Sequence, residues 1–241
     1  MIGTPPFRGG TAGARSARRR RTSAAPAPPG GPIDHPVHVW FSSPAGTAER
    51  ALLRRIAGHL GCDPDDVRLA RGPYGGMRVQ RSVTGQRNVH ISTSSPAGLS
   101  VLALTDLGPV GVDIEPIGRS AVPSGTWCTR TELAEIAAQP ADRAAATALL
   151  VWTCKEAVVK ALGTGLSLSP ARLGTVGLAG RRVLASVDDR PATGWIFVPG
   201  VAPNGFVGSL AVRAPIFPTE PERAGRAAAR LCLHPAAEAA S

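Results

Sequence analysis

The sequence has almost no lysine. Of its 27 basic side chains 25 are arginine, and the two lysines, Lys155 and Lys160, flank Glu156. Aromatic residues make up 4% of the chain, too few for the alternation of aromatic and basic side chains that a base-stacking surface needs. No apolar run approaches the ~20 residues of a membrane helix. The four cysteines and five histidines are scattered, which supports neither a disulfide framework nor a zinc cluster. These absences predict a globular, cytoplasmic protein with no membrane span.

The charge is unevenly distributed along the chain. Residues 1–35 contain six arginines and one acid, so they carry +5 of the net charge of +10 and leave +5 for the rest. This segment is rich in Gly, Pro, Ala and Arg and lacks apolar periodicity, so we expect a disordered arm without the apolar stretch of a secretory signal. Residues 215–241 are expected to be a flexible tail with at most one short helix. The working domain is therefore predicted to span residues 36–214.

Strand and helix patterns alternate within the working domain. A helix is expected from Thr47, a capping residue type, to Gly61, a typical helix stop. Two more helices are expected over 131–139 and 142–162, the second of which ends at Gly163. Alternation and short apolar runs between turn residues predict strands at 38–44, 67–72, 88–94, 99–106, 109–116, 181–189, 194–200 and 206–214. This order predicts an α+β fold of two similar α/β lobes in a pseudo-twofold arrangement, residues 36–110 and 111–214.

One predicted strand carries two acids on one face. In the segment GVDIEP, residues 111–116, a period of two puts Asp113 and Glu115 on the face opposite Val112 and Ile114. Two carboxylates roughly 7 Å apart repel each other, so a positive charge must offset them. A divalent cation with oxygen ligands would do so, and Mg²⁺ commonly uses one or two carboxylates together with substrate phosphates. A solvated acidic strand end is the alternative, and these residues alone do not separate the two.

The helix expected over 142–162 contains both lysines. Glu156 and Lys160, at i and i+4, could form a solvated salt bridge worth a few tenths of a kcal/mol. Arginine would make that pair equally well, so the pair does not explain why lysine is used here. Lysine differs in being a compact, rotatable point charge, which suits contact with a phosphate during a reaction. The lysines therefore indicate a phosphate site on this helix.

These motifs resemble those of the 4′-phosphopantetheinyl transferases of the surfactin-synthetase-activating type. The quoted pattern is Asp113-x-Glu115, then Trp152-x-x-Lys155-Glu156-Ala-x-x-Lys160-x-x-Gly163-x-Gly165-Leu166. Upstream, Arg50 matches an arginine that contacts coenzyme A in the family, and HISTS, residues 90–94, resembles its Asn-Leu-Ser-His-Ser strand end. Glu132 matches an acidic position between the motifs. The resemblance covers about residues 38–214.

The resemblance implies transfer of phosphopantetheine from coenzyme A to a serine of an apo acyl or peptidyl carrier protein, with 3′,5′-ADP leaving. It implies that Asp113, Glu115 and Glu156 hold Mg²⁺ on the pyrophosphate. It also implies that Lys160 and Lys155 neutralise the leaving phosphate. Glu156, or as a second choice Glu132, would accept the serine proton. The residues expected to contact coenzyme A are Arg50, Ser92, Thr93, Lys155 and Lys160. The excess positive charge favours an acidic carrier, and two lobes in one chain favour a monomer.

The sequence departs from the family pattern in the expected adenosine-phosphate pocket. Thr93 stands where the family has a histidine, and Gly76-Met77 replaces a Lys-Pro pair, although Arg78 follows. We therefore expect weaker coenzyme A binding or a rearranged pocket. One alternative is a catalytically impaired family member that acts as a coenzyme A or carrier-protein binding module. Nucleic-acid binding through the arginine-rich arm is a second alternative, against which the shortage of aromatic residues argues.

Overall fold

The computed structural model describes residues 36–42, 48–72, 76–81, 88–96, 98–178, 181–198, 201–213 and 230–234. All of them belong to one of the chain's two units, Pro32–Ser241. The arm expected over residues 1–35 lies outside the described residues. The described part is a mixture of helices and several sheets, so the predicted α+β class is confirmed.

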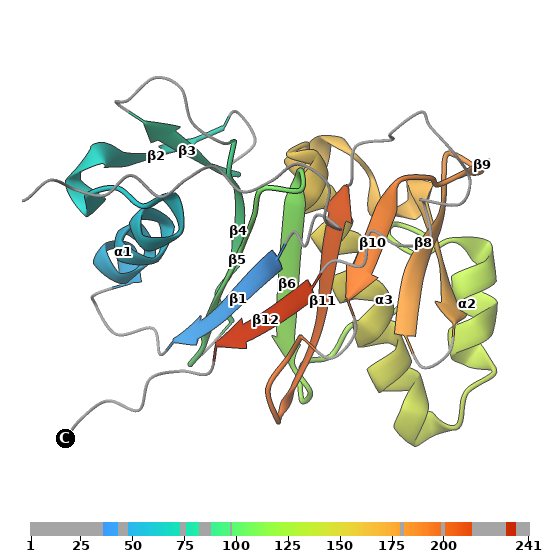
Figure 1. Ribbon diagram of the computed structural model, residues 1–241. Coiled ribbons are helices and arrows are strands. Elements are labelled where there is room, and N and C mark those ends of the chain that lie inside the picture. Colours follow the sequence, from blue (N-terminus) through green and yellow to red (C-terminus); the bar gives the residue numbers. More distant parts are fainter. Residues whose placement is uncertain are drawn as a thin grey trace, which may run out of the picture. The chain divides into compact units, whose positions relative to one another are not determined.

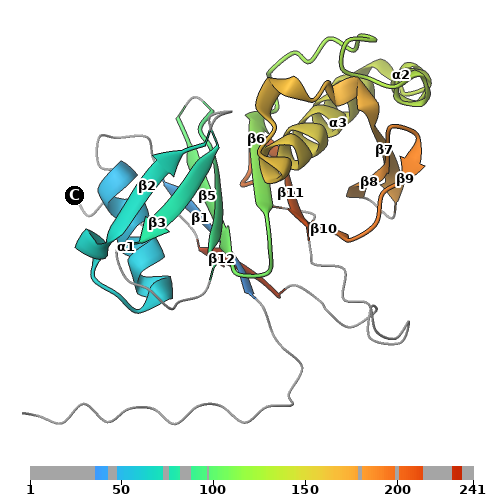
Figure 2. The same cartoon turned by 90° about the horizontal axis from the view of Figure 1, so that it is seen from above.

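One group of elements is built on a four-stranded sheet. The sheet has the order β12-β1-β5-β4, and its strands are Arg230–His234, Pro36–Ser42, Ser100–Thr105 and His90–Ser94. Helix α1 (Ala48–Leu60) packs Ile56 and Ala57 against Leu102 and Leu104 of β5. A hairpin of β2 (Val67–Arg71) and β3 (Met77–Arg81) lies beside α1, as Figure 2 shows. The helix and hairpin thus cover one face of the sheet.

A second group is built on the three-stranded sheet β10-β11-β6. Its strands are Trp195–Val198, Phe206–Arg213 and Val110–Pro116. Helix α3 (Ala141–Leu162) packs against β6 and β11, and α2 (Arg130–Ala137) packs against α3, as Figure 1 shows. Strands β7 (Leu173–Leu178), β8 (Arg181–Val187) and β9 (Arg190–Pro191) form a further sheet beside α3. The sequence patterns had not predicted β3 or β7 as strands.

The two main sheets share a hydrophobic core. Val37, Val39 and Val101 of the first sheet pack in one cluster with Val112 and Ile114 of β6. The faces predicted for the segment GVDIEP are therefore confirmed for its apolar side. Because these residues fill the space between the sheets, the other face of β6 is left for α3. The acidic residues of the strand therefore face the helix.

The C-terminal segment corrects one expectation. Residues 215–241 were expected to be a flexible tail, but Arg230–His234 form β12, which pairs in parallel with β1. Its Leu231 packs against the core shared by the two sheets. The tail prediction is wrong for these five residues because the free edge of β1, distant in sequence, supplies their hydrogen-bonding partners. The rest of the expected tail lies outside the described residues.

Glycine ends two of the helices, as the sequence predicted. Gly61 follows α1 with φ of 65°, and Gly163 follows α3 with φ of 66°, both in the left-handed region that favours glycine. Thr47, the expected cap of α1, lies outside the described residues.

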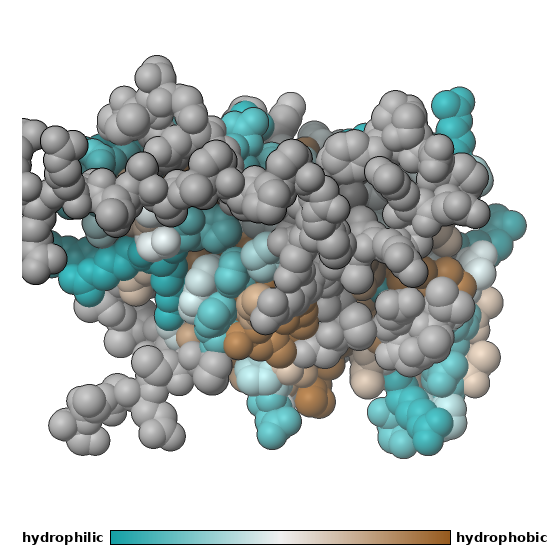
Figure 3. Space-filling model, in the orientation of Figure 1, coloured by the Kyte–Doolittle hydropathy of each residue, from teal (hydrophilic) through white to brown (hydrophobic). Residues whose placement is uncertain are grey.

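Within the described ranges, no helix combines the length and hydropathy that a membrane crossing requires. On the face shown in Figure 3, hydrophobic residues (brown) gather near the middle and hydrophilic residues (teal) toward the sides.

Candidate active site

A single glycine lets helix α3 approach strand β6 closely. A Cβ atom at Gly111 would overlap the carbonyl oxygen of Ala157 and crowd the backbone nitrogen of Ala161. Any side chain at this position would therefore push the helix away from the strand. This contact brings the last two turns of α3 over the acidic face of β6.

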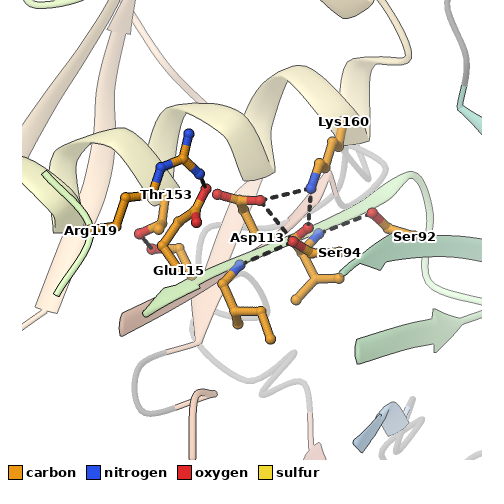
Figure 4. Close-up of polar contacts among 10 residues, drawn as sticks. Ser92, Ser94, Asp113, Glu115, Arg119, Thr153 and Lys160 are labelled. Atoms are coloured by element: carbon orange, nitrogen blue, oxygen red, sulfur yellow. Dashed lines mark hydrogen bonds and ion pairs between the residues drawn. The ribbon is translucent and has the colours of Figure 1, made fainter. Parts of the chain in front are cut away.

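Asp113 lies at this contact with two partners. Its Oδ1 accepts hydrogen bonds from Ser94 Oγ at 3.0 Å and from Lys160 Nζ at 2.8 Å, and Figure 4 shows these two residues converging on it from β4 and α3. Its Oδ2 is buried and has no hydrogen-bond partner among the described residues. Burial raises the pKa of Asp113, although Lys160 and Ser94 lower it, and Glu115 raises it further. Asp113 is thus a buried carboxylate whose Oδ2 is available to bind a cation or a hydrogen-bond donor.

The negative charges of Asp113 and Glu115 act on the third predicted carboxylate, Glu156. Burial raises the pKa of Glu156, and the charges of Asp113 and Glu115 raise it further, while Lys160 and Arg119 lower it. Glu115 is buried and accepts an ion-paired hydrogen bond from Arg119. The three predicted carboxylates therefore share one electrostatic site with two cations.

The donor set at this site suits a magnesium ion. In the part of the chain that the structure describes, no group of three or more His, Cys, Asp or Glu side chains is placed so that it could hold a metal ion. Carboxylate oxygens are nevertheless the ligands that Mg²⁺ prefers, and it usually completes its coordination with waters and substrate oxygens. The partnerless Oδ2 of Asp113 is a buried acceptor of the required kind. The donor chemistry fits the ion with one or two protein carboxylates, and the assignment of Asp113, Glu115 and Glu156 as its ligands stays a prediction.

Lys160 extends from α3 to the acidic face of β6, and its role toward a phosphate stays a prediction. Its Nζ donates to the Val112 carbonyl oxygen at 3.1 Å and to Asp113 Oδ1, and 29% of its side chain is exposed. The alternative in which Lys160 pairs with Glu156 on the surface is not what the structure contains, since the ammonium turns to β6 instead. Two of its three hydrogens are used, so a phosphate oxygen could take the third.

The prediction for Lys155 is wrong. Its ammonium is fully buried and lies 2.5 Å from Glu132 Oε2, and it donates to the carbonyl oxygens of Trp127 at 2.7 Å and Pro170 at 3.0 Å. An ammonium has three hydrogens, so none is left for coenzyme A. Lys155 is one residue before Glu156, and this single step along α3 turns it toward α2 rather than β6.

Glu132 is likewise excluded as a base. Its Oε1 accepts hydrogen bonds from the backbone N–H and the hydroxyl of Thr175, and its Oε2 accepts from Lys155 and from the Thr129 backbone N–H, the latter closing a capping box at the start of α2. Burial alone would raise the pKa of Glu132, but the hydrogen bonds from Lys155 and Thr175 bring it below its ordinary value. A buried carboxylate with every acceptor direction used cannot collect a substrate proton.

Ser92 and Thr93, two of the residues expected to contact coenzyme A, lie on opposite faces of strand β4. Ser92 Oγ accepts a hydrogen bond from the Val112 backbone N–H, so Ser92 faces β6. Thr93 points to the opposite side, where it lines a cavity of about 470 Å³ with residues of α1, β2, β3 and β5. Arg50 is exposed on α1. Their roles toward coenzyme A stay predictions, and the structure does not bring all three into one contact.

Two residues of the site were missed by the sequence reasoning. Ser94 lies on the same side of β4 as Ser92, and its Oγ both donates to Asp113 and accepts from the Ile114 backbone N–H at 3.4 Å. Arg119 follows Glu115 by four residues and pairs with it. Strand alternation could have identified Ser94, but nothing local indicated that Arg119 turns back along β6.

One known family matches the segment of the chain that contains this site. Residues 109–207 match the family model ACPS, the 4′-phosphopantetheinyl transferase superfamily. No curated protein matches the chain. The resemblance read from the motifs is thereby confirmed at the level of the superfamily, whereas the surfactin-synthetase-activating type stays a prediction. The segment that matches the 4′-phosphopantetheinyl transferase superfamily model, residues 109–207, contains the acidic strand β6 and the lysines of α3.

Proposed function

We propose that the protein transfers phosphopantetheine from coenzyme A to a serine hydroxyl of an acidic apo acyl or peptidyl carrier protein, with Mg²⁺ bound by Asp113, Glu115 and Glu156. The observation that carries the proposal is the buried Asp113 carboxylate, held by Lys160 with one oxygen unpartnered, inside the segment that matches the superfamily. Phosphoryl displacement depends on positioning and on charge neutralisation, which these residues can supply.

In the proposed reaction the serine oxygen bonds to the β-phosphorus as the bond from that phosphorus to the bridging oxygen breaks. The electron pair leaves on 3′,5′-ADP, and the serine proton passes to Glu156. Mg²⁺, when bound, would neutralise the pyrophosphate oxygens and make the phosphorus more electrophilic. Burial and neighbouring carboxylates raise the pKa of Glu156, which makes it a stronger base than an ordinary glutamate.

Lys160 and Asp113 have separate tasks in this proposal. Lys160 would place its third hydrogen on the leaving phosphate, where negative charge grows as the bond breaks. Asp113 keeps the Lys160 ammonium in position through Oδ1 and offers Oδ2 to the metal. Ser94 holds the Asp113 carboxyl from β4, so the rotamer of this ligand is fixed before substrate arrives.

We also propose that residues 36–110 and 111–214 act as two lobes of one monomer in a reducing cytoplasm. Support for the lobes comes from the repeated placement of one helix on a sheet, α1 on β5 and α3 on β6 and β11. The four cysteines are free thiols, which suits a reducing compartment.

The test is to incubate the protein with coenzyme A, Mg²⁺ and an apo acyl carrier protein, and to weigh the carrier by mass spectrometry. We expect the carrier to gain one phosphopantetheine and an equal amount of 3′,5′-ADP to appear. Asp113→Asn should abolish transfer, whereas Asp188→Asn, which removes an exposed carboxylate that pairs with Arg172, should not. Both variants should bind the carrier alike.

A catalytically impaired binding module is the second candidate. Lys160 and Arg119 already pair with two of the three carboxylates, which is the specific observation in its favour. Coenzyme A binding by calorimetry without mass gain on acyl or peptidyl carriers would favour this candidate and contradict transfer.

A further inference from the structure

Arg119 lies in the turn after β6, and its half-exposed side chain returns to the acidic face of that strand. A turn follows β6, in which the Arg119 backbone N–H donates to the Pro116 carbonyl oxygen at 2.9 Å and the Ile117 N–H donates to the Gly205 carbonyl oxygen at 2.9 Å. These bonds hold the backbone of the turn and send the Arg119 side chain back along the strand. The head group reaches Glu115, while 52% of the side chain stays exposed.

The guanidinium contacts Glu115 and lies within the electrostatic influence of two further carboxylates, Asp113 and Glu156. Figure 4 shows the Arg119 head group at the carboxylate of Glu115, with that of Asp113 beside it. The pKa of Arg119 is raised first by the hydrogen bond to Glu115, and then by the negative charges of Glu115, Asp113 and Glu156. An ordinary surface salt bridge between residues i and i+4 would couple to a single acid. Arg119 therefore balances the charge of the whole carboxylate group.

We propose that Arg119 is the built-in counter-cation of this group, which a divalent metal ion must displace from Glu115, so that Arg119 sets how tightly the site binds metal. The inference rests on the proposed function, because it takes the carboxylates as metal ligands. A guanidinium and a metal ion need the same lone pairs of Glu115, and both cannot have them at once. Because backbone hydrogen bonds hold the turn and the Arg119 side chain is half exposed, the guanidinium can move away from Glu115 while the turn stays folded.

The expected effect follows from the exposure of the pair. Exposed ion pairs contribute modestly, so loss of Arg119 should tighten metal binding by about two- to fivefold rather than by orders of magnitude. The effect should shrink as salt is raised, because the guanidinium is reached by solvent. In chelator the same substitution should lower the melting temperature, since the carboxylates lose a cation.

The experiment titrates the full chain with Mn²⁺, followed by electron paramagnetic resonance, and with Mg²⁺, followed by calorimetry, in both cases without coenzyme A. The variants are Arg119→Gln, which removes the charge, and Arg119→Lys, which keeps it. Arg172→Gln is the matched control, because Arg172 is 53% exposed and pairs with Asp188 away from the site. We expect tighter binding for Arg119→Gln, near wild-type affinity for Arg119→Lys, and no change for the control.

Two results would overturn the inference while leaving the proposed function in place. One is wild-type metal affinity in Arg119→Gln. The other is weaker metal binding in that variant, because Arg119 would then support the metal ligands rather than compete with the metal. If the wild-type protein bound neither metal ion, even with coenzyme A present, the metal assignment of the proposed function would fail, and this inference with it. A lower melting temperature of Arg119→Gln in chelator, reversed by Mg²⁺, would support the displacement.

Discussion

Replacing Lys155 by methionine should destabilise the protein severely, although Lys155 does not reach the proposed site. The ammonium is fully buried and bonded to Glu132 and to the carbonyl oxygens of Trp127 and Pro170. Methionine keeps an unbranched stem of similar length, so little packing volume is lost. The substitution thus isolates the loss of one charge and three donated hydrogen bonds.

The size of the effect comes from the partner that is left behind. Glu132 would stay buried without its cation, and breaking a buried ion pair on one side costs about 3–5 kcal/mol. A domain of this kind is stable by about 5–15 kcal/mol in all, so Lys155→Met should remove about a fifth or more of the free energy of unfolding. The double variant Lys155→Met/Glu132→Gln removes both charges and should recover part of that loss.

Urea unfolding followed by circular dichroism measures these differences. Arg172→Met, at an exposed ion pair, is the control and should leave the free energy of unfolding close to that of the wild type. The dependence of the free energy of unfolding on pH gives a second test. Because the pKa of Glu132 is lowered in the fold, the stability that its charge provides is present above about pH 4.5 and lost as the pH falls. If the free energy of unfolding of Lys155→Met lay within about 1 kcal/mol of the wild-type value, the buried ion pair would not stabilise the protein as the structure indicates.

Three further predictions concern the site and one distant cluster. Lys160→Arg keeps the charge beside Asp113 but replaces a compact ammonium by a forked guanidinium, so single-turnover transfer should fall about tenfold or more, or ~1.4 kcal/mol; an unchanged rate would remove Lys160 from the reaction. Burial and the charges of Asp113 and Glu115 raise the pKa of Glu156 in the metal-free protein, so carbon NMR without metal should show this carboxyl titrating above 4.5, and titration at the ordinary value would contradict the close grouping of the three acids. Burial and the neighbouring His59 and His234 lower the pKa of His38 from 6.5, so the folded state binds fewer protons and the melting temperature should fall as the pH drops below about 6.5. His38→Gln should flatten this dependence, and an equal slope in both proteins would contradict it.

Local pattern was enough to predict the arrangement of β6. Strand alternation correctly separated the apolar side of Val112 and Ile114 from the acidic side of Asp113, because one face packs against another sheet. Helix ends at Gly61 and Gly163 also followed from residue type alone. These features depend on neighbours in sequence, which a pattern contains.

The different fates of the two lysines depend on contacts that no pattern contains. Both lie on the half of α3 that follows Val151, and helical periodicity says that they face different directions but not what each direction meets. The close approach at Gly111 decides that Lys160 meets β6, and a capping glutamate on α2, Glu132, decides that Lys155 is buried. Arg119 is a similar case, since a turn bonded to Gly205 aims its side chain. Each outcome needs a partner far away along the chain.

The pairing of β12 with β1 ties the order of synthesis to the completion of a sheet. Strand β1 is the first described element to leave the ribosome, and the strand that covers its outer edge is the last. Until residues 230–234 emerge, the N–H and C=O groups along that edge have no strand to pair with, and an open edge is a template for pairing with another chain. A chain that stops at residue 213 would keep every residue of the proposed site and still expose β1, so its expected defect is self-association rather than lost chemistry.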